Sequence, residues 1–237
     1  MTSELILGIA AFLTATISGV IGFGGGMLLI AIMPMFLPPL AVVPIHGVVQ
    51  LASNSSRMAF SWHDVQWRMT PPFIIGTAFG VALFALVLFN ISADYIPLAI
   101  SIYILLNLWS EHFARSIRRY ESLYTVGFMQ SGLGIIVGAP GPLSLAMLSK
   151  RLDDPNQVIA TTALFVTISH LAKLLVFGLI GFSFLEYWPV MAVMLIGSVL
   201  GSWAGTRIRT SLDHERLTLA VKILLTGLCL KMIWDVL

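Results

Sequence analysis

Long apolar segments, separated by short polar stretches, make up most of the chain. Eight apolar blocks can be distinguished, at residues 5–37, 40–61, 71–90, 94–110, 122–149, 156–181, 188–207 and 215–236. A helix needs about 20 mostly apolar residues to cross a bilayer, and most of these blocks have that length. The pattern therefore predicts an all-α polytopic membrane protein with about eight membrane segments.

Two of the blocks are long and are interrupted by glycine and proline. The first interruption is GFGGG at 22–26, and the second is GAPGP at 138–142. Proline cannot continue a helix, and irregular backbone at membrane depth is tolerated only where protein buries it or where it lines a cavity. The two breaks therefore indicate a central site, where backbone N–H groups at the broken helix ends could bind an anion; the alternative is that the small residues serve tight helix packing. Their candidate residues are Gly24, Gly25, Gly26, Gly138 and Gly141.

The order of features in the first half of the chain recurs in the second half. Each half begins with a Gly-rich break, and a stripe of polar residues ending in a cation follows it, at Arg57 and at Lys173. The spacing of Gly76 and Gly80 recurs at 197 and 201. An ordered series of this kind indicates duplication. We expect one membrane domain over residues 1–237, with internal repeats at about 4–112 and 120–237.

The positions of the basic loops predict how the blocks cross the membrane. If all eight blocks crossed once, the loops that hold Arg68 and Arg115 would lie opposite those that hold Lys150 and Arg207. That arrangement violates the positive-inside rule. If each broken block instead enters and returns as a helical hairpin, every basic loop is cytoplasmic. The sequence therefore predicts two inverted repeats, each a broken or re-entrant hairpin plus three transmembrane helices.

Composition excludes a soluble protein. The 237 residues are 58% hydrophobic and only 10% charged, whereas soluble domains carry about 25% charged residues. The single cysteine, Cys229, excludes an internal disulfide and a cysteine metal cluster. The GFGGG segment lacks the preceding strand and the acidic residue of a dinucleotide site. We expect the lipid bilayer as a partner, with no cofactor and no nucleic acid.

A polar stripe marks the second apolar block. His46, Gln50 and Asn54 are spaced by four and share one helix face, and Arg57 follows one turn later. A cation at membrane depth costs several kcal/mol unless it faces a partner or a polar cavity, so the stripe indicates an anion site. The alternative is that the stripe holds the helix bundle together and that Arg57 extends its side chain to the cytoplasmic surface.

A similar stripe in the second half contains Thr162, Thr167, His170 and Lys173. Lys173 lies near the middle of its block, and no Asp or Glu occurs in the middle of any apolar block. The substrate itself could therefore supply the missing negative charge. The alternative that the sequence leaves open is a neutral, buried lysine.

These segments together resemble a known family. The motifs GVIGFGGG at 19–26, PIHGVVQLASNSSR at 44–57, GAPGPL at 138–143 and TALFVTISHLAKLLVFGLIG at 162–181 are similar to those of the TauE/SafE sulfite exporters, also called toluene-sulfonate uptake permeases. The resemblance implies a permease of the bacterial inner membrane for small, often sulfur-containing anions such as sulfite or organosulfonates. It does not identify the substrate.

We therefore expect a small anionic solute to move by alternating access, with a proton or sodium as a possible coupling ion. A permease for divalent metal cations is the main alternative, because His46 and His170 could bind a metal. The absence of acids in the apolar blocks counts against it. An intramembrane enzyme is disfavoured, because no GxSxG motif and no paired aspartates occur. The sequence leaves the direction of transport and the oligomeric state open.

Overall fold

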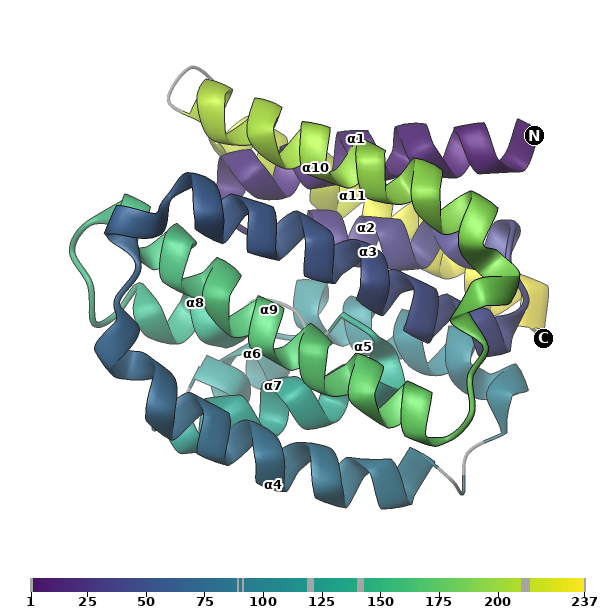
Figure 1. Cartoon of the computed structure of the whole chain (residues 1–237), viewed down its shortest axis with the longest axis horizontal. Helices are drawn as coiled ribbons and strands as arrows, with labels where there is room; N and C mark the ends of the chain where they lie inside the picture. Colours follow the sequence, from purple (N-terminus) through teal and green to yellow (C-terminus); the bar gives the residue numbers. More distant parts are fainter. Residues whose placement is uncertain are drawn as a thin grey trace.

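The chain folds into a bundle of helices, shown by a computed structural model that describes residues 2–88, 90, 92–118, 122–139, 143–209 and 214–236. Figure 1 shows the arrangement. The helices of the first half are α1 (Thr2–Ile21), α2 (Gly25–Ile32), α3 (Pro39–Phe60), α4 (Thr70–Leu88), α5 (Ile96–Trp109) and α6 (Glu111–Arg118). The helices of the second half are α7 (Leu123–Val137), α8 (Leu143–Leu148), α9 (Pro155–Leu179), α10 (Trp188–Ile208) and α11 (His214–Val236). Short 3₁₀ turns lie at Met33–Met35, Trp62–Asp64, Trp67–Met69, Ala93–Tyr95 and Phe184–Tyr187.

The fold-class prediction is confirmed: the described chain is an all-α membrane protein. Five of its helices, α1, α4, α9, α10 and α11, are long and apolar enough to cross a bilayer. Two further helices are shorter than a full membrane crossing. α5, in the predicted segment 94–110, has 14 residues, and α7, in the predicted segment 122–149, has 15. Each broken block divides at its glycines into a longer and a shorter helix, α1 with α2 and α7 with α8.

Corresponding helices of the two halves run in opposite directions. In Figure 1, α3 runs from right to left, and α9 beside it runs from left to right. The same inversion relates α4 to α10 and α5 to α11. The most extensive helix contacts pair α1 with α10, α4 with α7, α3 with α9, α3 with α10 and α5 with α11, and each pair joins the two halves. Exchanging the halves turns α1–α10 into α7–α4 and α3–α10 into α9–α4, which also pack together, and it leaves α3–α9 and α5–α11 unchanged, as a two-fold relation requires.

Glycines allow the helices to approach closely in the α1–α10 and α4–α7 pairs. A Cβ built at Gly201 would lie 2.2 Å from the carbonyl oxygen of Phe12, on α1. A Cβ built at Gly80 would lie 2.1 Å from the carbonyl oxygen of Phe128, on α7. Small residues let membrane helices pack with their backbones in contact, so the repeated glycine spacing serves helix packing.

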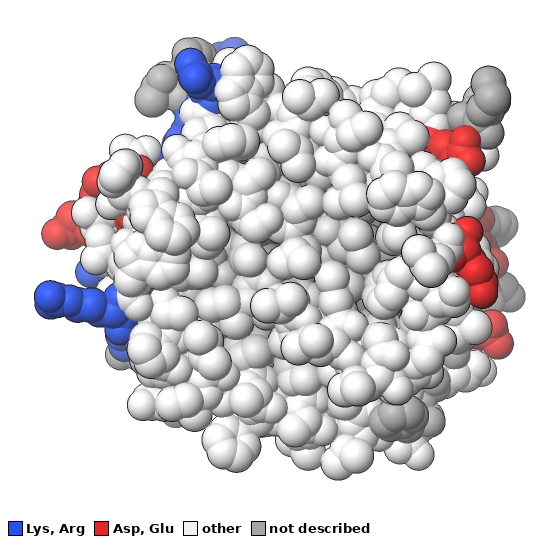
Figure 2. Space-filling view, viewed as in Figure 1, with Lys and Arg blue, Asp and Glu red and all other residues white. Residues whose placement is uncertain are grey.

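Charges gather at the two ends of the bundle. In Figure 2 the Lys and Arg side chains on the visible face lie at the left end, together with some acidic side chains, and a broad uncharged band separates them from acidic side chains alone at the right end. We call the end with Arg68, Lys150 and Arg207 the basic end, and the end with Glu4 and Asp94 the acidic end. The band carries large exposed apolar side chains, including Phe79, Leu83, Ile196 and Leu200, as a lipid-facing surface requires.

The charge distribution predicts which end faces the cytoplasm. Single cysteines placed at Asp94 and Glu186, with the buried Cys229 replaced by alanine, should react with an impermeant thiol reagent added outside the cell. Cysteines at Arg68 and Lys150 should react only after permeabilisation. Reaction of Arg68 and Lys150 variants from opposite sides would disprove the hairpin arrangement.

The glycine contacts predict a second, structural result. Gly201→Ala should destabilise the protein by about 1–3 kcal/mol, because the new methyl group meets the backbone of α1. Each kcal/mol lowers the melting temperature by roughly 2–4 °C in a protein of this size. Gly227→Ala is the matched control, because no atom lies within 4 Å of a Cβ built there. Equal melting temperatures for the two variants would contradict the packing argument.

Candidate functional site

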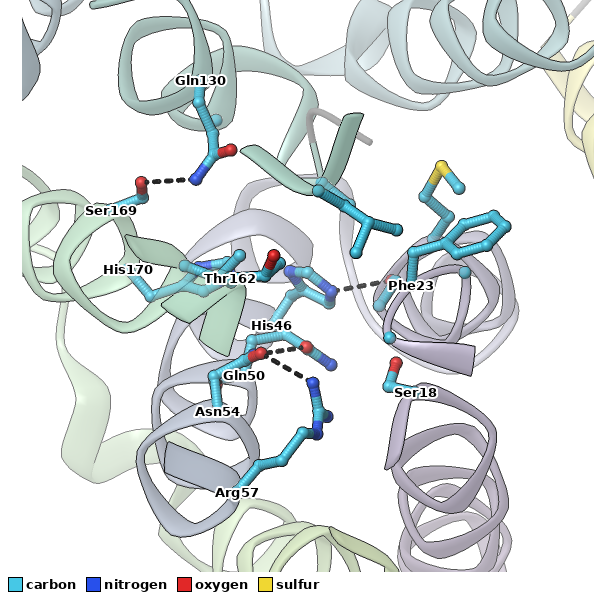
Figure 3. A pocket seen from close by; sticks show the side chains of 18 of the residues that line it. Ser18, Phe23, His46, Gln50, Asn54, Arg57, Gln130, Thr162, Ser169 and His170 are labelled. Atoms are coloured by element: carbon cyan, nitrogen blue, oxygen red, sulfur yellow. Dashed lines mark hydrogen bonds between the residues drawn. The ribbon is translucent and has the colours of Figure 1, made fainter. Parts of the chain in front are cut away.

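One cavity lies between the two halves of the bundle, and both broken blocks contribute to it. Its volume is about 70 Å³, which is room for a few water molecules or a small ion. The polar side chains that line it come from α1, α3, α7 and α9. They are Ser18, His46, Gln50, Asn54, Arg57, Gln130, Thr162, Ser169, His170 and Lys173. Figure 3 shows the α3 side chains on one wall, the α9 side chains on another, and Ser18 with Phe23 on a third.

The α3 wall is the polar stripe that the sequence predicted. Asn54 donates hydrogen bonds to the backbone oxygen and to Oε1 of Gln50, at 2.8 and 3.1 Å. Arg57 donates to Asn54 Oδ1 at 3.1 Å and to Ser53 Oγ at 3.3 Å. The Arg57 side chain is only 2% exposed, so the alternative in which it reaches the cytoplasmic surface is wrong. Figure 3 shows its guanidinium pointing back along α3 toward Gln50.

Lys173 has a partner that the sequence did not reveal. Its Nζ donates a 2.5 Å hydrogen bond to the backbone oxygen of Gly138, directly after the last residue of α7. A cation is favoured there, because the carbonyl groups at a helix C-terminus carry partial negative charge. The expectation that only a substrate could partner Lys173 is therefore incomplete. The bond leaves the charge uncompensated, because no Asp or Glu lines the cavity among the described residues.

The two cations lie at different depths. A Cβ built at Gly47 would lie 3.1 Å from Cδ of Lys173, so Lys173 is level with Gly47 on α3. Arg57 is ten residues further along α3, which places its backbone roughly 15 Å closer to the basic end. The cavity therefore has a cation toward each of its ends.

The histidines lie close to Lys173, since His46 is next to Gly47 on α3 and His170 is one turn before Lys173 on α9. The rings of His46 and His170 meet edge to face, with their centroids 5.7 Å apart. His46 Nε2 lies 2.9 Å from the carbonyl oxygen of Gly26, in the first turn of α2. Both rings are buried, and Nδ1 of each has no hydrogen-bond partner in the protein.

Unsatisfied polar atoms concentrate in this cavity. Seven buried side-chain atoms in the described residues lack a hydrogen-bond partner. Four of them belong to cavity residues: His46 Nδ1, Arg57 Nε, Thr162 Oγ1 and His170 Nδ1. Buried polar groups are normally paired, so this concentration indicates that a ligand or water completes the site. All four residues come from the predicted stripes, and Thr167 is the stripe residue that does not reach the cavity.

The other predicted site residues, Thr167 and the glycines of the two breaks, lie partly inside and partly outside the cavity. Thr167 does not line the cavity, and its hydroxyl donates to the backbone oxygen of Ala163 on its own helix. Gly24 and Gly26 line the cavity, and Gly24 adopts a φ of +84°, which favours glycine. Gly25 instead packs on α1, with the oxygen of Thr14 1.8 Å from a built Cβ. Gly138 contributes its carbonyl to Lys173, and Gly141 lies outside the described residues.

The breaks act mainly through their carbonyl groups, although the sequence led us to expect amide donors. Gly26 and Gly138 accept hydrogen bonds from His46 and Lys173, and the amide of Ser144, near the start of α8, donates to Gln130 Oε1. The N-terminus of α2 does have amide groups without a side-chain cap, and Gly24, Gly26 and Met27 border the cavity there. Its positive dipole end adds to the positive potential.

Sequence reasoning missed the contributions of α1 and α7. Ser18 and Gln130 line the cavity but belong to no polar stripe. Each is an isolated polar residue next to the glycines of a broken block, and that proximity is the signal that could have identified them. Ser169 also lines the cavity, and its hydroxyl takes part in a network with Gln130 and Ser131.

Comparison with known proteins agrees with this picture. The model of the family described as "Sulfite exporter TauE/SafE" matches residues 7–232, which is nearly the whole chain. No curated protein and no solved structure gives a significant match.

Proposed function

We propose, because the chain belongs to the sulfite exporter TauE/SafE family of membrane transporters, that it carries a small sulfur-containing anion by alternating access. The family transports sulfite and related sulfur anions. The observation that carries the proposal for this chain is the cavity, which two buried cations line without any described acid. We further propose that the basic end faces the cytoplasm of a bacterial inner membrane.

The electrostatics of the cavity favour an anion. Two unit charges 4 Å apart interact by about 4 kcal/mol at an effective dielectric near 20. Arg57 and Lys173 are both buried and have no described acid beside them in the cavity, so a bound anion would supply their missing counter-charge. The gain is reduced by the cost of removing water from the anion. A divalent cation would meet the same positive charges as repulsion.

The open hydrogen-bonding capacity supports an oxyanion in particular. Arg57 Nε and the Thr162 hydroxyl can each donate to an oxygen atom, and both lack a partner. Sulfite and sulfonate groups present several oxygen acceptors on one sulfur atom. A small cavity with donors on several sides suits such a group better than it suits an extended carboxylic acid.

The positions of the cations suggest how the anion moves. Lys173 with His170 would bind an anion in the half of the cavity nearer the acidic end, and Arg57 with Thr162 would bind it nearer the basic end. Transfer between them would accompany a change in which end of the cavity is open. The inverted repeats provide the structural basis, since two related arrangements can open to opposite sides.

Ligand-dependent thermal stability tests this proposal against the metal alternative. Sulfite or methanesulfonate should raise the melting temperature of the purified protein, because a ligand that binds the folded state stabilises it. Cobalt, nickel and zinc at the same free concentration should not, and the described residues contain no cluster of three His, Cys, Asp or Glu that could hold a metal. The anion effect should disappear in Lys173→Met and persist in Lys231→Met, a surface control. Stabilisation by metal alone, lost in His46→Ala, would favour the metal permease.

Two threonines on α9 give a sharper test of the site. Thr162→Val removes an unpartnered hydroxyl from the cavity and should weaken anion binding about 10-fold or more, since a hydrogen bond to a charged group contributes about 1.5–3 kcal/mol. Thr167→Val makes the same chemical change outside the cavity and should leave the affinity within about two-fold, since its hydroxyl only bonds its own helix. Radiolabelled anion binding to purified protein measures both. A larger effect at Thr167 would show that the site is misplaced.

A further inference from the structure

We infer that His46 and His170 carry a proton together with the transported anion, so that the protein is a proton–anion symporter. This inference rests on the proposed function, because it concerns the same cavity. It assigns a coupling ion and the residues that bind it.

The hydrogen bond of His46 determines which of its nitrogens can accept a proton. A backbone carbonyl only accepts hydrogen bonds, so Nε2, which lies 2.9 Å from the oxygen of Gly26, must carry a hydrogen. In the neutral ring, Nδ1 is then unprotonated and carries a lone pair that can accept a proton. This atom is buried and has no hydrogen-bond partner in the protein. His46 is therefore held as a base, with its acceptor nitrogen unoccupied.

His170 places a second unpartnered nitrogen beside this one. Its ring lies edge to face with His46 at a centroid distance of 5.7 Å, and its Nδ1 is also buried without a partner. The titratable side chains that line the cavity are these two histidines on α3 and α9, Arg57 on α3 and Lys173 on α9. Polar but uncharged groups face them from the other elements, at Ser18 on α1 and Gln130 on α7.

The charges that surround the histidines link proton binding to anion binding. A proton on either ring adds a positive charge near Lys173 in a buried site, which is unfavourable while the cavity is empty. A bound anion offsets that charge. Each ligand therefore raises the affinity for the other by the same factor, because coupling between binding equilibria is reciprocal.

This coupling gives a balanced transport step. One anion and one proton enter the cavity from the same side, the proton occupies a histidine nitrogen, and both leave on the other side. For a monovalent anion the step moves no net charge. The combined gradients of proton and anion then set the direction of transport, and the membrane potential alone does not drive it.

The experiment measures protons and anions together in proteoliposomes. Methanesulfonate is the probe, because it is the anion of a strong acid and carries no proton of its own at neutral pH. When it is added outside, its uptake should be accompanied by the disappearance of about one external proton per anion, followed with a pH-sensitive dye. A potassium diffusion potential set with valinomycin should not change the rate of uptake.

Variants connect the proton to the two histidines. His46→Gln and His170→Gln should lower the number of protons moved per anion, whatever remains of the uptake rate. His63→Gln is the matched control, because His63 lies in the exposed turn between α3 and α4, outside the cavity. It should keep the ratio of the unaltered protein.

The possible outcomes separate this inference from the proposed function. Uptake of methanesulfonate that depends on membrane potential and moves no protons would overturn the symport and leave the anion permease standing. A proton ratio that is unchanged in both cavity variants would overturn the assignment to His46 and His170. If neither sulfite nor methanesulfonate is taken up, while the protein is folded and its melting temperature responds to a metal, the proposed function itself fails.

Discussion

The backbone carbonyls at the two broken blocks impose the constraint on which the rest of the structure depends. A helix that stops inside a membrane protein leaves carbonyl groups without partners, and lipid offers no donor. The chain supplies donors from distant segments: Lys173 donates to Gly138, directly after α7, and Arg209 Nε donates at 3.0 Å to Gly19, in the last turn of α1. Each break therefore has a buried cation beside it, and at the second break that cation, Lys173, is also part of the cavity.

Inverted pairing brings these donors to the breaks. Lys173 belongs to α9, which packs against α3, so its side chain reaches both the end of α7 and the level of Gly47. Arg209 follows α10, which packs along α1, and it reaches the last turn of α1. Neither half contains all the walls of the cavity. The site exists only when the halves interlock, so helix packing through the glycines and formation of the site are one event.

The sequence was most informative where one helix contributes a whole pattern. Spacing by three and four placed His46, Gln50, Asn54 and Arg57 on one face, and all four line the cavity. It was less informative where the partner is backbone. The carbonyl of Gly138 that holds Lys173 has no residue-type signature, so an open charge was expected there. Thr162 and Thr167 look alike in sequence, and only the packing around α9 decides which of them faces the cavity.

The bonds that fix the side chains of the cavity also leave hydrogen-bonding capacity that the proposed anion could use. His46 uses Nε2 on Gly26 and so presents Nδ1, and Lys173 uses one of its three donors on Gly138. Arg57 donates from two of its nitrogens to Asn54 and Ser53, and its Nε has no partner in the protein. Each side chain is fixed by part of its hydrogen-bonding capacity, and the remainder is free for a ligand. Because fixing these groups requires no ligand, the donors are already in position before an anion arrives, and little ordering cost opposes binding. A polar residue that is only structural would use its full capacity within the protein, and this is why we propose that these three residues bind the ligand as well as hold the scaffold.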